Sequence, residues 1–150
     1  MNIFNNGVLI IMIVIITQCG SSRTASDQIN LKVSVEKIDS WLNFMPGGSP
    51  TFHIAGQIKI ERKGSDTAEI IKLKQVSIFQ ERKKIYEFVP LFEIINDKES
   101  DSGFRFGTNK GLSINRDLDE EKMISAELQF ESAGRSFLHK IENIKIEKAY

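Results

Sequence analysis

The chain has 150 residues, a length that suggests one domain. Its 20 basic and 20 acidic residues cancel to a formal net charge of zero, which excludes binding to nucleic acid driven by basic charge. Charged residues make up 27% of the chain and hydrophobic residues 41%, the balance of a folded rather than a disordered protein. The single cysteine excludes an intramolecular disulfide, so stability must come from an apolar core.

An unbroken apolar run from Val8 to Ile16 lies near the start of the chain. As a helix this run would rise only about 14 Å, well short of the ~30 Å hydrocarbon core of a bilayer. Such a length is typical of the apolar part of an export signal and not of a transmembrane helix. The residues Ile16-Thr17-Gln18-Cys19 end the run.

These four residues resemble the lipobox of bacterial lipoproteins. In that family a branched apolar residue lies three positions before a cysteine, the thiol takes a diacylglyceryl group, and cleavage makes the cysteine the new N-terminus. Ile16 and Cys19 match this pattern and Thr17 is acceptable, whereas Gln18 is bulkier than the usual Gly or Ala. A second departure is the absence of Lys and Arg before the apolar run. The resemblance implies a signal peptide over residues 1–18 and a lipid anchor on Cys19.

Residues 19–29 are rich in Ser, Thr, Ala and Asp and have no apolar periodicity, which predicts a flexible tether. Gly20 follows the cysteine, where Asp would mark retention on the inner membrane in the sorting rule known for such proteins. The resemblance therefore implies a location on the bacterial cell envelope, and Gly20 favours the outer membrane over the inner membrane.

From residue 31 onward apolar and polar side chains alternate with a period of two, as in half-buried strands. The alternation predicts strands within Leu31–Glu36, Phe52–Glu61, Ile70–Gln80, Ile85–Phe92, Phe104–Phe106, Leu112–Ile114, Met123–Glu131 and Phe137–Ile146. Turn signals separate several of them, at Lys63–Asp66, Glu81–Lys84 and Ser132–Arg135.

Four places in this pattern are irregular. Gly56 falls on the inner face of its strand, which predicts a bulge or a close backbone approach. The apolar phase changes near Lys74–Gln75, which predicts a bulge or the meeting of two short strands. Ile85–Phe92 is apolar on both faces and predicts a central strand, although Pro90 indicates an edge or a bulge. Asn96–Gly103 predicts a polar loop.

Seven or eight short strands and no helical period predict an all-β fold, an antiparallel β-sandwich over residues 30–150. The number and length of the strands are similar to those of immunoglobulin-like or fibronectin-III-like domains. The Cys–Trp–Cys hallmark of antibody domains is absent, so the resemblance concerns architecture and implies no function.

Motifs of serine hydrolases, zinc peptidases, phosphate loops and dinucleotide sites are absent from the sequence, which predicts a protein that is not an enzyme and needs no cofactor. The two histidines, His53 and His139, have polar neighbours and are expected to be solvated strand residues. Asp97, Glu99 and Asp101 alternate as calcium ligands do, but Lys98 and the lack of a distal Glu argue against a calcium loop.

The segment Trp41–Pro50 holds the only tryptophan, with Phe44 and Met45 close by, and Pro46-Gly47 suits a type II turn. We expect a loop between two strands that either contacts a partner through Trp41, Phe44 and Met45 or closes the end of the core.

Met45 and His53 also offer soft and borderline ligands near Trp41. Exported copper-binding β-sandwich proteins use Met and His clusters, and their N-terminal region is faintly similar to this one, although their paired His-x-Met ligands are absent here.

Two functional hypotheses follow. The first is a membrane-anchored envelope lipoprotein that acts as a non-enzymatic interaction or accessory module, with an envelope protein as partner. The alternative is a periplasmic protein that binds a copper-like metal or a small ligand through Met45 and His53.

Overall fold

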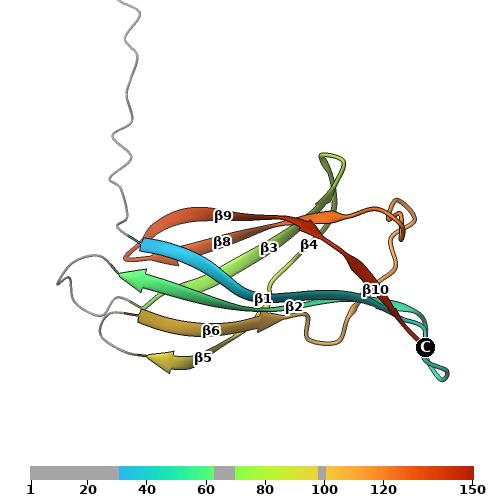
Figure 1. Ribbon diagram of the computed structural model, residues 1–150, viewed down its shortest axis with the longest axis horizontal. Helices are drawn as coiled ribbons and strands as arrows, with labels where there is room; N and C mark the ends of the chain where they lie inside the picture. The colour runs from blue at the N-terminus through green and yellow to red at the C-terminus, as the bar shows by residue number, and fades with distance from the viewer. Residues whose placement is uncertain (1–30, 63–69, 98–100) are drawn as a thin grey trace, which may run out of the picture.

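The computed structural model describes residues 31–62, 70–97 and 101–150, and within them the chain forms strands and no helix. The strands are β1 (Leu31–Asn43), β2 (Thr51–Arg62), β3 (Lys72–Gln80), β4 (Lys83–Phe88), β5 (Leu91–Asp97), β6 (Asp101–Gly107), β7 (Leu112–Ser113), β8 (Ile124–Ser132), β9 (Arg135–Ile144) and β10 (Ile146–Ala149). They build two sheets that pack face to face, so the predicted β-sandwich is confirmed (Figure 1).

The chain fills the two sheets in pairs of strands. The first sheet has the order β10-β1-β2-β6-β5, with β7 paired to the end of β2, and the second has the order β4-β3-β8-β9. Neighbouring strands are antiparallel except β1 and β10, which run parallel. The last strand thus returns beside the first, a long-range pairing that no local pattern encodes.

The alternating apolar residues of both sheets meet in one core. Its largest fully buried side chains include four phenylalanines, three from β2 and β6 in the first sheet and one from β8 in the second: Phe52, Phe104, Phe106 and Phe130. Burial of each such side chain contributes roughly 1.5–3 kcal/mol. In β8 every second residue is buried, as the sequence predicts for Ile124, Ala126, Leu128 and Phe130.

The phase change in β3 is a bulge, as one of the two sequence alternatives has it. The pairing of β3 with β8 shifts between Leu73 and Gln75, which inserts Lys74 and returns the apolar residues to the inner face.

The hairpins at Glu81–Arg82 and Ala133–Gly134 are also confirmed. In both turns the two central residues have positive φ, as in the type I′ turns that fit the twist of a hairpin.

The prediction of one central strand over Ile85–Phe92 is wrong. β4 ends at Phe88 in the second sheet, Val89 and Pro90 cross over, and β5 begins at Leu91 in the first sheet. Both β4 and β5 are edge strands, and Pro90 lies at the crossing because it has no N–H to give to a ladder. The predicted strand Phe137–Ile146 divides in the same way at Lys145, between β9 and β10.

Strands replace most of the loop expected at Asn96–Gly103, because β5 extends to Asp97 and β6 starts at Asp101. The signal peptide, Cys19, the tether over residues 19–29 and the turn at Lys63–Asp66 lie outside the described residues. Within the described ranges there is no helix long and apolar enough to cross a membrane.

Gly56 marks a close approach, the second of the two alternatives for this residue. A Cβ atom added to Gly56 would lie 2.6 Å from Cε1 of Phe106 and 3.0 Å from the carbonyl oxygen of Lys37. Phe106 is buried and pairs with Gly56 across β2 and β6. The aromatic ring therefore occupies the space that any other residue would fill at position 56.

We expect Gly56→Ala to lower the free energy of unfolding by about 1–3 kcal/mol, since the added methyl overpacks the core against Phe106. Urea denaturation monitored by circular dichroism measures the change. Gly48→Ala is the matched control, because nothing lies within 4 Å of a Cβ at that exposed position. An unchanged midpoint for Gly56→Ala would contradict the close packing of this contact.

Candidate functional site

Trp41 lies in a strand and not in the expected loop. β1 continues to Asn43, with Ser40 and Leu42 buried on its inner face and Trp41 between them on the outer face. The loop that follows covers only residues 44–50, and its turn at Pro46–Gly47, with φ of +103° at Gly47, agrees with the expected type II geometry. Trp41 therefore does not close the core.

The outer face of the first sheet holds a stacked pair of rings. Trp41 pairs with His53 across β1 and β2, and the ring centroids lie 5.0 Å apart with planes within 5° of parallel. The Nε2 atom of His53 lies 2.9 Å from Oγ1 of Thr51, and Nδ1 lies 3.4 Å from Oγ1 of Thr108. Gly111 approaches the ring edge so closely that a Cβ there would lie 2.6 Å from it. The orientation of the histidine ring is thus held by the stack, by the two threonine hydroxyls and by Gly111.

The structure brings Trp41 and His53 together, but Met45 belongs to the loop beyond β1. Its side chain is 56% exposed, and its backbone N–H donates to Oδ1 of Asn43 over 3.0 Å. A metal at His53 would have to displace one threonine hydroxyl from a ring nitrogen. Groups of three or more His, Cys, Asp or Glu side chains able to hold a metal are absent from residues 31–62, 70–97 and 101–150. The metal hypothesis for Met45 and His53 gains no support from this geometry.

Burial lowers the pKa of His53 below the ordinary value of 6.5, because desolvation disfavours the imidazolium. The neutral ring has one N–H, so it donates to one threonine hydroxyl and accepts from the other. His139, on β9, has its pKa lowered by burial as well. The sequence predicted that both histidines are solvated, whereas the structure shows both of them partly buried.

Stability should therefore fall as the pH falls through the ordinary histidine range. Below about pH 6.5 the histidines of the unfolded chain are protonated, whereas His53 and His139 of the folded chain remain neutral to a lower pH. Acid therefore favours the unfolded state. We expect a lower melting temperature at pH 5.5 than at pH 7.5, and a smaller difference in His53→Gln, whose amide can still bond to Thr51. His139→Gln measures the other share, and a wild-type difference that survives both substitutions would contradict this assignment.

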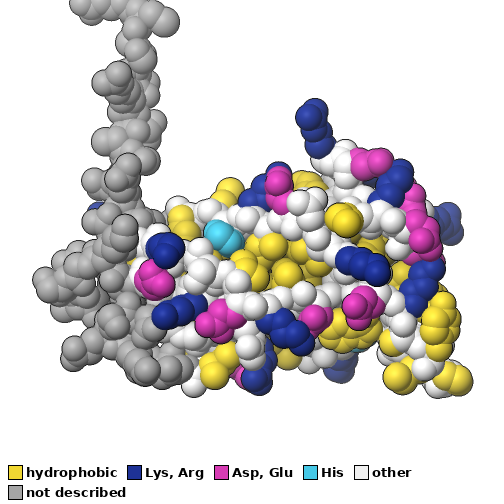
Figure 2. Space-filling model, in the orientation of Figure 1, with side chains coloured by type: hydrophobic (Ala, Val, Ile, Leu, Met, Phe, Trp, Pro, Cys, Tyr) yellow, Lys and Arg dark blue, Asp and Glu magenta, His cyan; other side chains and the backbone are white. Residues whose placement is uncertain are grey.

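The loop after β1 is joined to the end of the chain. The backbone N–H of Phe44 donates to the carbonyl of Ala149 over 2.8 Å, and the ring of Phe44 stacks on that of Tyr150 with centroids 5.7 Å apart. Tyr150 remains 81% exposed. We call residues 44–50 together with Tyr150 the hairpin tip. Hydrophobic side chains gather at this end of the molecule, beside the C-terminus (Figures 1 and 2).

Tyr150 was missed by the sequence reasoning, since only the parallel pairing of β10 with β1 brings it to Phe44. A signal for the tip was nevertheless present in the sequence. Asp, Glu, Lys and Arg are absent from the 19 residues between Ser40 and Ile58, in a chain that is 27% charged. This uncharged stretch comprises the end of β1, the loop and the first part of β2.

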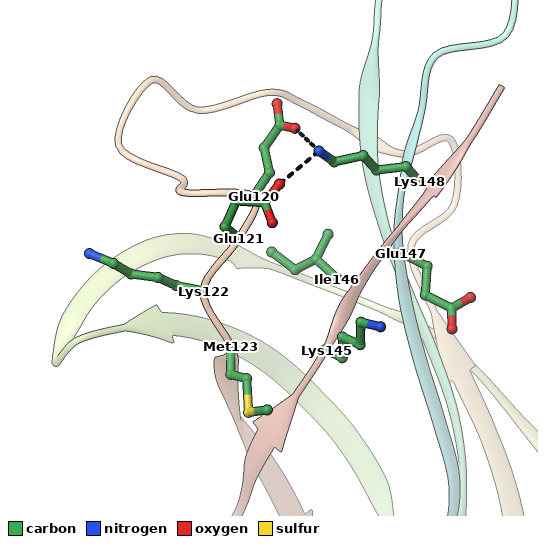
Figure 3. Close-up of a pocket in the computed structure, with 8 residues that line it drawn as sticks. All are labelled: Glu120, Glu121, Lys122, Met123, Lys145, Ile146, Glu147 and Lys148. Carbon is green, nitrogen blue, oxygen red and sulfur yellow. Dashed lines mark hydrogen bonds and ion pairs between the residues drawn. The ribbon is translucent and has the colours of Figure 1, made fainter.

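A groove of about 540 Å³ lies along β10, lined by Glu120–Met123 on one side and Lys145–Lys148 on the other (Figure 3). The Nζ atom of Lys148 bridges the carboxylates of Glu120, at 2.8 Å, and Glu121, at 3.0 Å. The hydrogen bonds that the Lys148 ammonium donates to these carboxylates raise the pKa of Lys148 well above its usual value. One of the two acidic charges is therefore balanced from within the chain.

No family model matches the chain, and no curated protein is significantly similar to it. Its function must therefore be inferred from its own residues.

Proposed function

We propose that the protein is a lipid-anchored lipoprotein of the bacterial cell envelope and that its β-sandwich is a non-enzymatic contact module. The observation that carries the second part is the exposed hairpin tip, whose side chains carry no charge and in which Met45 and Tyr150 are 56% and 81% exposed. Apolar side chains that gather on a surface usually mark a contact. Phe44 and Met45 belong to this tip, and Trp41 stands next to it on the outer face of the sheet.

The direction of β1 supports a division between an anchored end and a contact end. β1 begins at Leu31, next to the tether proposed for residues 19–29, and ends at Asn43, next to the hairpin tip. At ~3.3 Å per residue its length is about 40 Å. In Figure 1 the start of β1 and the C-terminus lie at opposite ends of the sandwich.

The chemistry of the tip suits binding better than catalysis. Apart from backbone groups it offers the thioether of Met45, the rings of Phe44 and Tyr150 and the hydroxyl of Ser49, which hold no proton-transfer group that titrates near neutral pH. His53 is the nearest histidine along β2, and its ring is already stacked and hydrogen-bonded. These side chains favour a non-enzymatic contact over catalysis.

The anchor is tested by labelling cells with a clickable palmitate analogue and isolating the protein. We expect the wild-type chain to carry the label, since the lipobox resemblance makes Cys19 the acylated residue. Mass spectrometry should find Cys19 at the N-terminus with the added lipid. Cys19→Ala should lose the label and Ser21→Ala should keep it. A free thiol at Cys19, or a label that persists in Cys19→Ala, would show that the protein is held in another way.

A further inference from the structure

We propose that the hairpin tip is a second membrane contact, which inserts its apolar side chains into the surface of the bilayer that carries the lipid anchor. The lipid anchor in this proposal is part of the proposed function, whereas the affinity of the tip for lipid is argued from the structure of the tip. The partner of the contact module would then be a lipid surface.

The tip exposes side chains that a bilayer surface accepts. Met45 is more than half exposed and Tyr150 almost fully, while Phe44 is half-buried beneath Tyr150. Methionine is flexible and adapts to an irregular apolar environment. Tyrosine is enriched at the level of the lipid headgroups, where its ring is apolar and its hydroxyl stays hydrated.

The charge pattern favours lipid for the same region. At the average of the chain, 27%, a stretch as long as Ser40–Ile58 would carry about five charged side chains, and it has none. A charged side chain is costly inside a bilayer, whereas a wet protein surface gains solubility from it. On β10, Lys148 pairs with Glu120 and Glu121, and the exposed Glu147 lies opposite Trp41, outside the uncharged stretch.

Hydrogen bonding in the tip argues against a protein partner. The N–H of Phe44 is bonded to Ala149, and Oδ1 of Asn43 is used by the N–H of Met45. Among side chains of the loop, Ser49 alone offers a hydroxyl. Specific protein interfaces carry several directional hydrogen bonds around their apolar centre, and this tip offers mainly apolar area. A bilayer needs no such directional match.

The tip is also preorganised. The Phe44–Ala149 bond, the Phe44–Tyr150 stack and the Pro46–Gly47 turn hold the loop in one shape before it meets a partner. A contact formed by a rigid loop loses little conformational entropy, so even a few apolar side chains yield measurable binding.

The dimensions allow the tip to reach the anchoring bilayer itself. Residues 19–29 span at most about 36–40 Å when extended, close to the length of about 40 Å estimated for β1. The sandwich can therefore lie along the membrane with its anchor at one end and the tip at the other. Two weak attachments on one molecule reinforce each other, and a lipid anchor gains stability from a second contact.

Flotation with protein-free vesicles tests the affinity for lipid. The probe is the chain from residue 19 with Cys19→Ala, which lacks the leader and the lipid and contains every described residue. We expect it to float with vesicles of neutral phosphatidylcholine, because the side chains of the tip carry no charge and need no anionic lipid. Met45→Asp should lower the vesicle partition coefficient about tenfold.

Met123→Asp is the matched control, because Met123 is 58% exposed, as Met45 is 56%, but lies in the groove along β10. It should float like the parent protein. Equal melting temperatures of the two variants would show that both remain folded. A parent that does not float, or an equal loss in both variants, would overturn the proposal and leave the anchor of Cys19 untouched.

An experiment with the lipidated protein then distinguishes contact with the anchoring bilayer from contact with a second membrane. With brominated lipid in the vesicles that carry the protein, the emission of Trp41, the only tryptophan, should be quenched, and more weakly in Met45→Asp. Brominated lipid in added vesicles should have no effect, and quenching there would overturn the assignment to the anchoring bilayer.

A photoreactive residue at position 45 in cells should label lipid, and the same residue at position 123 should not. A protein adduct at position 45 would refute the lipid surface and retain the contact module.

Discussion

A hydrogen bond from an interior side chain helps to hold the chain where it returns from one sheet to the other at Lys145. The hydroxyl of Ser40, which is 1% exposed, donates to the carbonyl of Lys145 over 2.8 Å. Without that hydroxyl a carbonyl at the crossing would lose its partner, at a cost of about 1–3 kcal/mol. β10 then pairs with β1 and delivers Ala149 and Tyr150 to Phe44. The interior serine therefore helps to position the exposed hairpin tip.

A buried amide side chain holds the loop that faces β10 through hydrogen bonds to the backbone of that loop. The side chain of Gln80 is 5% exposed, accepts from the N–H of Asp119 and donates to the carbonyls of Asp119 and Lys122, the first two over 2.8 Å. Polar groups in an interior must be paired, and here the pairing also fixes a loop to the end of β3. Glu120 and Glu121 lie between those two bonded residues, which explains how both meet Lys148.

The alternation of apolar residues predicted the strands and their inner faces, but it could not predict to which of the two sheets a strand belongs. The inner face of β8, the bulge at Lys74 and the close approach at Gly56 each have a local signal: a period, a phase change, or a glycine among apolar residues. At Pro90 and at Lys145 the chain changes sheets while the apolar pattern continues, so in each case two edge strands were predicted as one strand. The stack of Tyr150 on Phe44 joins residues 106 positions apart, which no pattern within a window of ten residues contains.

The location of the exposed apolar side chains limits edge-to-edge pairing with a second copy. An edge strand that is flat and apolar invites another chain to pair with it. The edge strands β4 and β9 carry cations, Lys83 and Arg135 among them, and β5 exposes aliphatic side chains but follows Pro90 and has a bulge between Ile94 and Asn96. The hairpin tip has no ladder to extend, because its backbone turns at Gly47. Apolar area placed on a turn can thus meet a bilayer without offering a strand to a second copy.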